Sequence, residues 1–435
     1  MQRLTAVSHY KDDNGDRPTV LLYARRGKWF GLPRYYYRAS ALQSIAKTFI
    51  DKTISGKSID CSFIEVDPDH PNVPDQRKLE NKFRRIIEAG GTGVLLRATT
   101  GFGKTIVMLR FLCALGEKAI ITVPKEDLIE QWIKEILLHT NIKRKEIGII
   151  QQNKCEYENK KVVVAMMHSL TLRKKAYPKE MHSSFGTVII DEGHLVGAEQ
   201  LGAVSCMFPA KYRLVCSATP DRKDGMDDVL KYHIAQWRIG PEKDKQPKPK
   251  IFVKFWERSC GKLPPINNAM ALRSFLITKL AMNPARNMAI LNYAKAIFNK
   301  GRKVIIISER KAQLYYLRDM LKNGGVPENS IGVYVGGLSK EARASLVKNC
   351  SIFLATYGAM KIGTDVPSVS SLILATPQSS AVQIVGRIRR ILEGKGQPVV
   401  VDIVDTSYKK TKQWYNSRRK DYESMGAEFV RLVQR

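Results

Sequence analysis

A glycine-rich loop between a hydrophobic strand pattern and a helix pattern is the strongest chemical signal in the sequence. The stretch VLLRATTGFGKTIVML covers residues 94–109, and the loop pattern begins at Ala98 and ends on Lys104 and Thr105. Glycines let backbone N–H groups turn toward phosphate oxygens at a helix N-terminus, where the helix dipole favours an anion. The Lys104 ammonium can reach the β and γ phosphates of ATP, and the Thr105 hydroxyl can ligate Mg²⁺. We expect the phosphates to be bound by Thr100, Gly101, Phe102, Gly103, Lys104 and Thr105.

Two adjacent carboxylates follow a second hydrophobic run. The segment TVIIDEGHL, residues 187–195, places Asp191 and Glu192 at the C-terminal end of a strand that reads as buried. Ligands of open α/β sheets gather at that edge, and a carboxylate buried there is costly without a partner such as Mg²⁺. We expect Asp191 to hold the metal through water and Glu192 to orient or deprotonate the water that attacks the phosphate.

The elements that position these residues form two alternating patterns. Short Val/Ile-rich runs alternate with helical stretches from about residue 90 to 220, and again from about 300 to 405. Such runs suit parallel strands buried on both faces, with helices as crossovers. We interpret the Pro- and Lys-rich segment 241–255 as the connection between two α/β lobes. Proline disfavours both an α-helix and the hydrogen bonding of a β-sheet, and the repulsion between like charges extends the chain. The alternative is a long surface loop within one lobe.

The net charge and the cysteine content indicate which kinds of partner and which class of protein are expected. The 435 residues include 72 basic and 41 acidic ones, a formal net charge of +31, which favours a polyanion such as nucleic acid. A solubility surface, or an acidic protein or membrane partner, is the alternative. The seven cysteines form no C-x-x-C pair, which favours a reduced, intracellular protein with buried thiols over a zinc protein. No apolar run is long enough to span a membrane.

The first part of the chain combines aromatic and basic residues. Segment 17–38 has six basic residues and no acidic one, interleaved with aromatic residues. Aromatic rings stack on bases while Arg and Lys meet phosphates, so Arg25 and Trp29 are candidates for contacts with nucleic acid. A small β-hairpin unit whose aromatic residues form a core is an equally good interpretation.

Several short stretches together resemble the motifs of superfamily 2 helicases of the DExH type, in the order that this family has them. The sequence Asp191-Glu192-Gly193-His194 resembles the DExH box, although Gly193 departs from the commoner Ala or Cys. The other stretches are 122–124 (TVP, motif Ia), 217–219 (SAT, motif III), 355–367 (motif V) and 383–390 (QIVGRIRR, motif VI).

The resemblance implies two tandem RecA-like P-loop lobes, with parallel sheets covered by helices on both faces, and a role for most motif residues. Arg387 and Arg390 would act as arginine fingers from the second lobe, and Gln383 would help sense nucleotide or water. Gly363 and Asp365 would link the nucleotide site to the strand-binding face.

Further roles follow from motif position. His194 would couple the carboxylate box to Ser217 and Thr219, and Gln76 would read the adenine. The nucleic-acid contacts expected from motif position are Thr122, Pro124, Lys125, Ser308 and Thr356.

These patterns predict an ATP-dependent DNA helicase. We expect a small N-terminal accessory domain (1–70), a first lobe (71–240), an interlobe linker (241–284) and a second lobe (285–435). The compact plan is most similar to bacteriophage UvsW-type and RecG-like helicases, which implies branch migration of forked DNA in replication, recombination or repair. The expected partners are single-stranded DNA and branched or duplex DNA, and no membrane is expected to be involved. We expect the protein to be a monomer in the cytoplasm. A duplex translocase without strand separation, an RNA helicase and a nucleotide-gated binding switch are the alternatives.

Overall fold

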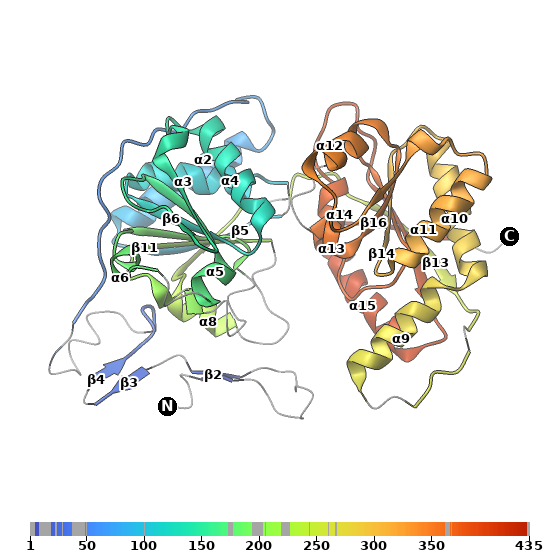
Figure 1. The fold of residues 1–435 in the computed structure, drawn as a ribbon, viewed down its shortest axis with the longest axis horizontal. Helices are drawn as coiled ribbons and strands as arrows, with labels where there is room; N and C mark the ends of the chain where they lie inside the picture. Colours follow the sequence, from blue (N-terminus) through green and yellow to red (C-terminus); the bar gives the residue numbers. More distant parts are fainter. Residues whose placement is uncertain are drawn as a thin grey trace. The chain divides into compact units, whose positions relative to one another are not determined.

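The computed structural model divides the chain into two compact units, Met1–Lys243 and Asp244–Arg435, which are described separately below (Figure 1). It describes all residues except 1–4, 8–18, 22–23, 28, 37–47, 49, 100, 173–176, 194–202, 205, 219–226, 243, 260, 266–267, 362–365, 367 and 433–435. Within the described residues, no helix has both the length and the apolar character needed to cross a membrane.

The first unit is built on an eight-stranded sheet in the order β12-β5-β11-β10-β6-β9-β7-β8. Every neighbouring pair is parallel except β7 and β8. The strands are β5 (Gly93–Arg97), β6 (Ala119–Val123), β7 (Ile147–Gln151), β8 (Lys154–Cys155), β9 (Val162–Met166), β10 (Thr187–Ile190), β11 (Tyr212–Ser217) and β12 (Trp237–Ile239). Because the apolar runs are buried on both faces, the sheet needs helices on both sides.

Two helical layers meet that need (Figure 1). The helices are α2 (Val73–Glu88), α3 (Lys104–Leu115), α4 (Glu126–His139), the 3₁₀ turn η2 (Arg144–Glu146), α5 (Met167–Leu172), α6 (Lys179–His182) and α8 (Asp227–His233). Residues of α2, α3 and α4 pack with one face of the sheet, and residues of α5, α6 and α8 pack with the other. Along β5, Val94 and Leu96 belong to the first core and Leu95 to the second, which is the alternation a strand requires.

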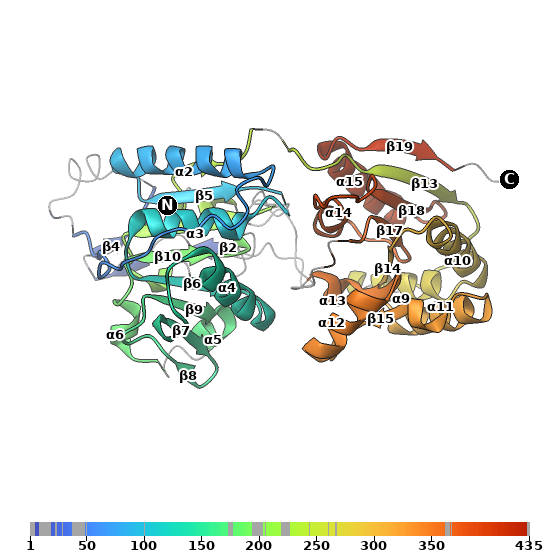
Figure 2. The ribbon, with the colours of Figure 1, turned by 90° about the horizontal axis from the view of Figure 1, so that it is seen from above.

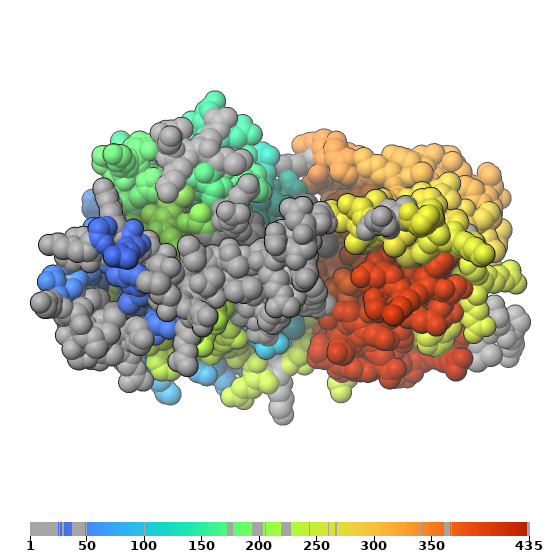
Figure 3. Space-filling model, turned by 90° about the horizontal axis from the view of Figure 1, so that it is seen from below, coloured from blue at the N-terminus to red at the C-terminus, as the bar shows by residue number. Residues whose placement is uncertain are grey.

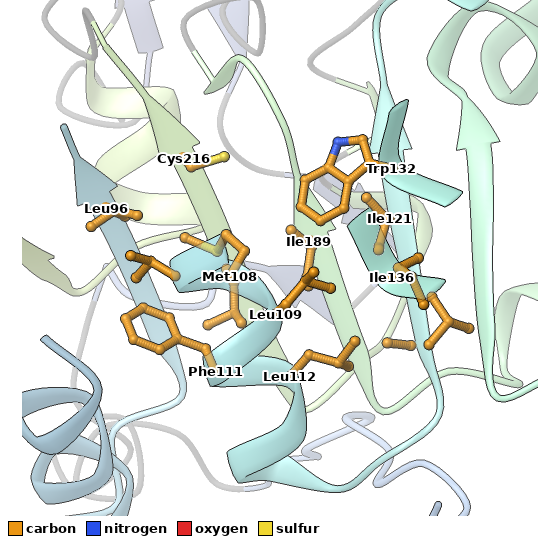
Figure 4. Packing of buried hydrophobic residues seen from close by; sticks show 14 of the residues in the cluster. Leu96, Met108, Leu109, Phe111, Leu112, Ile121, Trp132, Ile136, Ile189 and Cys216 are labelled. Carbon is orange, nitrogen blue, oxygen red and sulfur yellow. The ribbon is translucent and has the colours of Figure 1, made fainter. Parts of the chain in front are cut away.

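Helix α3 crosses the centre of the first core. Figure 4 shows Met108, Leu109 and Leu112 of this helix lying over the strands that carry Leu96 and Ile189. All five side chains are fully buried, so the start of α3 is held firmly against the carboxyl ends of the strands.

The N-terminal residues form two small hairpins. Strands β1 (Thr5–Val7) and β2 (Thr19–Leu21) pair antiparallel, as do β3 (Ala24–Arg26) and β4 (Trp29–Gly31). Tyr35 donates its backbone N–H to Tyr232 O (2.8 Å), and Tyr36 packs edge-on against the Tyr232 ring. These two tyrosines therefore anchor the hairpins to the first unit.

Residues 51–71, which we call the strap, lie along the first unit without forming a helix or a strand, and residues 68–71 form turns. Isolated β-bridges join Ile54 to Ala210, Ser58 to Glu117 and Phe63 to Thr140. The strap ends where α2 begins, and Figure 2 shows α2 lying beside α3.

The second unit is built on a seven-stranded, fully parallel sheet in the order β15-β16-β14-β17-β18-β13-β19. Its strands are β13 (Lys250–Trp256), β14 (Val304–Ser308), β15 (Ile331–Tyr334), β16 (Ile352–Thr356), β17 (Ser371–Leu374), β18 (Val399–Asp405) and β19 (Glu428–Arg431). Segment 250–256, expected within the interlobe connection, is instead the strand between β18 and β19. The Pro- and Lys-rich composition applies only to 241–250, whereas Ile251 and Val253 are buried in the sheet.

Helices again cover both faces of this sheet. They are α9 (Ala269–Ala281), α10 (Pro284–Phe298), α11 (Lys311–Asn323), the 3₁₀ turn η4 (Glu328–Ser330), α12 (Lys340–Asn349), α13 (Tyr357–Lys361), α14 (Val382–Ile388) and α15 (Lys409–Ser424). Helices α10 and α11 pack on one face, and α12 to α15 on the other. Helix α9 packs against Tyr408 and Trp414 at the start of α15, and Figure 3 shows α9 (yellow) beside the α15 region (red). The predicted fold class, two α/β lobes with parallel sheets, is thus confirmed.

Candidate active site

The phosphate-binding loop leaves the carboxyl end of β5 and ends at the first residue of α3. Gly101 and Gly103 have φ angles of 94° and 92°, in the left-handed region that favours glycine. Gly103 is also the N-cap of α3, and a Cβ there would lie 2.6 Å from Nε2 of Gln76. Both glycines are therefore needed for the backbone to turn at this helix terminus.

Side chains at the start of α2 donate hydrogen bonds to the carbonyl groups of the phosphate-binding loop. Nδ2 of Asn72 lies 3.3 Å from the carbonyl oxygens of both Gly101 and Phe102, and Nε2 of Gln76 donates to Phe102 O at 2.9 Å. Asn72, Gln76 and Phe102 are all buried. With these carbonyls satisfied on one side, the loop N–H groups can face a phosphate on the other. The amide nitrogen of Gln76 is thus used on the loop, and its contact with adenine stays a prediction.

Asp191 lies directly after β10, two strands away from β5 in the sheet. Its carboxylate is buried and accepts hydrogen bonds from Trp132 Nε1 (3.0 Å), from Cys216 Sγ (3.2 Å) and from the backbone N–H of Glu192 (2.8 Å). Figure 4 shows Trp132 and Cys216 on opposite sides of Ile189, the strand residue that leads to Asp191.

The pKa of Asp191 depends on its burial and on the groups around it. Burial raises the pKa of Asp191, and the neighbouring Glu192 raises it further. The hydrogen bonds from Trp132 and Cys216, and the positive charge of Lys104, act in the opposite direction. The influence of Lys104 brings the phosphate-binding loop and the carboxylate pair into one electrostatic site.

The backbone of the carboxylate box is tightly constrained. Glu192 has a φ of 53°, a left-handed conformation that non-glycine residues adopt rarely and that recurs at functional sites. A Cβ on Gly193 would overlap Cγ2 of Val215 on β11. The glycine that departs from the commoner Ala or Cys of the DExH box is thus explained by the close approach of β11.

The residues at this edge of the sheet suit Mg²⁺ and a nucleoside triphosphate. The half-buried Thr105 hydroxyl and the buried Asp191 carboxylate are hard oxygen donors, which Mg²⁺ prefers. Lys104 supplies a positive charge at the N-terminus of α3, where phosphate is favoured.

Three residues of this site were not found by sequence reasoning. Asn72 lies four residues before Gln76, on the same side of the helix start, which is the only local signal for its role. Trp132 and Cys216 are 59 and 25 positions away from Asp191. Their roles depend on how α4 and β11 pack beside β10, which single-residue patterns do not specify.

Motif VI of the second unit lies on α14 and the residues that follow it. Gln383, Arg387 and Arg390 are half-buried, whereas Arg389 is almost completely buried. Arg389 donates to Asp244 Oδ2 (2.7 Å), to Pro247 O (2.9 Å) and to Gln246 O (3.3 Å). Arg389 therefore ties the first residues of the second unit to α14.

The structure corrects two of the expected nucleic-acid contacts. Thr122 is completely buried and donates its hydroxyl to Ile189 O (3.3 Å). Ser308 is also completely buried, and its hydroxyl donates to Gln313 Oε1 (2.6 Å) and accepts from Arg310 N (2.9 Å). Neither hydroxyl can meet a strand in this conformation.

The remaining candidates are more varied in exposure. Pro124 is buried, Lys125 is exposed at the start of α4, and Thr356 is half-buried at the carboxyl end of β16. Arg25 is exposed in β3 and pairs across the hairpin with the exposed Phe30.

The structure describes only part of the remaining predicted residues. Ser217 is buried at the end of β11, next to Cys216. Outside the described part lie Thr100, His194, Thr219, Gly363, Asp365 and the side chain of Trp29.

Comparison with known proteins gives one family match and several viral relatives. Residues 69–222 match the family described as "Type III restriction enzyme, res subunit". The chain is 30% identical over 413 residues to "Putative ATP-dependent RNA helicase L396" of Acanthamoeba polyphaga mimivirus, covering 92% of this chain and 76% of that protein. It is 25% identical over 398 residues to "Putative ATP-dependent RNA helicase QP509L" of African swine fever virus, covering 85% of this chain and 76% of that protein.

The fold is also found among solved structures. Saccharomyces cerevisiae Dbp5 bound to RNA and ADP BeF3 matches with a TM-score of 0.54 and 15% identity, covering 83% of this chain and 93% of that chain. At this identity the likeness concerns the fold alone.

Proposed function

We propose that this chain, which belongs to the superfamily 2 helicases and is an ATP-dependent helicase, unwinds or branch-migrates forked and junction DNA. The observation that carries the ATPase part is the convergence of the phosphate-binding loop and the Asp191–Glu192 pair at one edge of one parallel sheet. A DNA substrate is favoured by the description of the matching family, which names a restriction enzyme subunit. The net charge of +31 favours nucleic acid of either kind.

In the proposed reaction, Lys104 and the loop N–H groups bind the β and γ phosphates of ATP. Thr105 and Asp191 hold Mg²⁺, which when bound neutralises charge on the phosphates and orients them. Glu192 orients the attacking water and accepts its proton. Trp132 and Cys216 keep the Asp191 carboxylate in one orientation, because each donates to a different oxygen of it.

The second unit contributes positive charge in this proposal. Arg387 and Arg390 stabilise the negative charge that develops on the transferred phosphate, and Gln383 senses the nucleotide or the water. Arg389 has a different task, since it is buried against Asp244 and holds α14 in place.

The proposed nucleic-acid contacts are those that the structure leaves accessible. Lys125 and Thr356 follow the carboxyl ends of strands in their respective units. The exposed Arg25 and Phe30 lie directly across the β3–β4 hairpin, where a guanidinium and an aromatic ring can meet a phosphate and a base. We propose that this hairpin engages the duplex or junction.

Steady-state ATPase assays on matched substrates test the proposal. We expect turnover to rise with forked and Holliday-type DNA, and strands to be displaced or migrated only when ATP is present. Lys104→Ala and Glu192→Gln should each remove turnover, while DNA binding largely persists. Near-normal turnover in either variant would refute the site assignment. ATPase that duplex DNA stimulates without any strand displacement would make the chain a translocase.

An RNA helicase is the second candidate, because both viral relatives named above are described as ATP-dependent RNA helicases. The discriminating measurement is the ATPase stimulation by single-stranded RNA and DNA of the same length and sequence. Stimulation by RNA equal to or above that by DNA, with unwinding of an RNA duplex, would replace the DNA proposal.

A further inference from the structure

Two cysteines that are far apart in the sequence lie side by side in the first unit. Cys61 belongs to the strap, and Cys113 lies in the last turn of α3. Their Sγ atoms are 2.6 Å apart, although the residues are 52 positions apart. Unbonded heavy atoms in van der Waals contact are about 3.5–4.0 Å apart, so these two sulfur atoms are closer than separate side chains pack. Both residues are half-buried.

The backbone on both sides of Cys61 is fixed against the first unit. Two residues before it, Ile59 donates its N–H to Gly116 O at 2.8 Å. Directly after it, Ser62 exchanges hydrogen bonds with Asn141, through the Asn141 side chain at 2.9 Å and its backbone N–H at 3.2 Å. Cys113 is held on α3, whose neighbouring residues Phe111 and Leu112 are completely buried. The sulfur atoms are therefore brought together by two rigid backbones.

We propose that Cys61 and Cys113 are an oxidation site that forms an intramolecular disulfide with hydrogen peroxide. In the first step the Cys61 sulfur is oxidised to a sulfenic acid and one molecule of water is released. The Cys113 sulfur then attacks the Cys61 sulfur, the S–S bond forms, and the hydroxyl leaves with the Cys113 proton as a second water. The two sulfurs together lose two electrons, and the two oxygens of the peroxide gain them.

The hydrogen bond with Cys61 raises the pKa of Cys113, and burial raises it further. The reaction balances equally with the two sulfurs exchanged, because either order gives the same disulfide and two molecules of water.

The disulfide would close a loop that contains the second half of the strap, α2 and the phosphate-binding loop. Asn72 and Gln76, which brace the loop carbonyls, both lie inside the closed segment. Closing this segment restricts the unfolded chain and needs no change in the folded contacts. We expect oxidation to stabilise the first unit and to leave ATP turnover within about twofold of that of the reduced protein, since no residue of the active site moves.

The experiment uses the full chain, first reduced with dithiothreitol and then titrated with hydrogen peroxide. Alkylation and peptide mass spectrometry measure the Cys61–Cys113 cross-link, and calorimetry follows thermal unfolding. We expect the cross-linked peptide at low molar excess of peroxide, with a rise of at least about 5 °C in the Tm of the first unit that dithiothreitol reverses.

Variants assign the effect to the pair. Cys61→Ser and Cys113→Ser should each remove both the cross-link and the Tm shift, whereas the matched control Cys155→Ser should keep both. The inference is overturned if the exposed Cys206 becomes oxidised in the wild-type chain with no Cys61–Cys113 peptide. It is equally overturned if the Tm shift persists in Cys61→Ser. Because the wild-type comparison needs no variant, a variant that fails to fold leaves the test intact.

Discussion

Replacing Trp132 with phenylalanine removes one hydrogen bond to Asp191 and keeps most of the ring that fills the space between α4 and the sheet. Trp132 is 1% exposed, and its Nε1 lies 3.0 Å from Asp191 Oδ2. Burial raises the pKa of Asp191, and the hydrogen bond from Trp132 opposes that rise. A hydrogen bond to a buried charged group contributes about 1.5–3 kcal/mol, which corresponds to about 10- to 150-fold in an equilibrium constant.

The expected result is a weaker Mg²⁺ site in an otherwise folded protein. The Mg²⁺ concentration for half-maximal ATPase should rise by about 10-fold or more, in the range seen when groups that orient metal ligands are removed. The ionised carboxylate is the form that binds Mg²⁺, and losing the donor raises the pKa of Asp191 further. The acidic limb of the pH profile should therefore move to higher pH.

Two measurements separate this effect from general damage. The first is Mg²⁺-dependent binding of a fluorescent ATP analogue in a Glu192→Gln background, which requires no turnover. The second is the matched control Trp414→Phe, which removes a buried indole from the second unit, away from the carboxylates. An Mg²⁺ titration of Trp132→Phe that overlays the wild-type curve would show that Trp132 only fills space.

Three further changes have defined outcomes. Gly193→Ala places a Cβ against Val215, which should lower the free energy of unfolding by about 1–3 kcal/mol and reduce kcat. Adding Val215→Ala should restore kcat. A fully active Gly193→Ala variant would contradict the packing argument. Burial lowers the pKa of His233 from 6.5 to about 4, so the folded state disfavours the protonated ring and stability is lost as the pH falls from above 6.5 toward 4. The loss should reach about 1.4 kcal/mol at pH 5.5, and urea unfolding of His233→Gln should show a flatter pH dependence than wild type. Arg389→Ala leaves Asp244 without its ion pair and should destabilise the second unit by at least about 2 kcal/mol in denaturant melts, with Arg389→Lys closer to wild type.

The parts of the site that lie on consecutive residues were predictable from sequence. The loop from Gly101 to Thr105 and the pair Asp191–Glu192 each follow an apolar strand, and parallel strands bring their carboxyl ends to one edge. The family resemblance identified motif VI as 383–390, and the structure shows that its residues Gln383 and Arg387 lie on α14.

The errors have physical causes in particular elements. Thr122 lies inside β6 and Ser308 is the last residue of β14, and helices cover both faces of each sheet, so a side chain of these strands is buried whichever face it points to. Residues 250–256 follow a run of Pro and Lys, which hid a strand whose alternate residues are buried. The contacts of Asn72, Trp132 and the cysteine pair join distant segments, and only the packing of helices on the sheet reveals them.

The bond between Arg389 and Asp244 has a mechanical consequence. Asp244 is the first residue of the second unit, and Arg389 immediately follows the helix that carries Arg387. A displacement of Asp244 is therefore passed to the end of α14 through its ion pair with Arg389, and the same guanidinium also holds the carbonyl groups of Gln246 and Pro247.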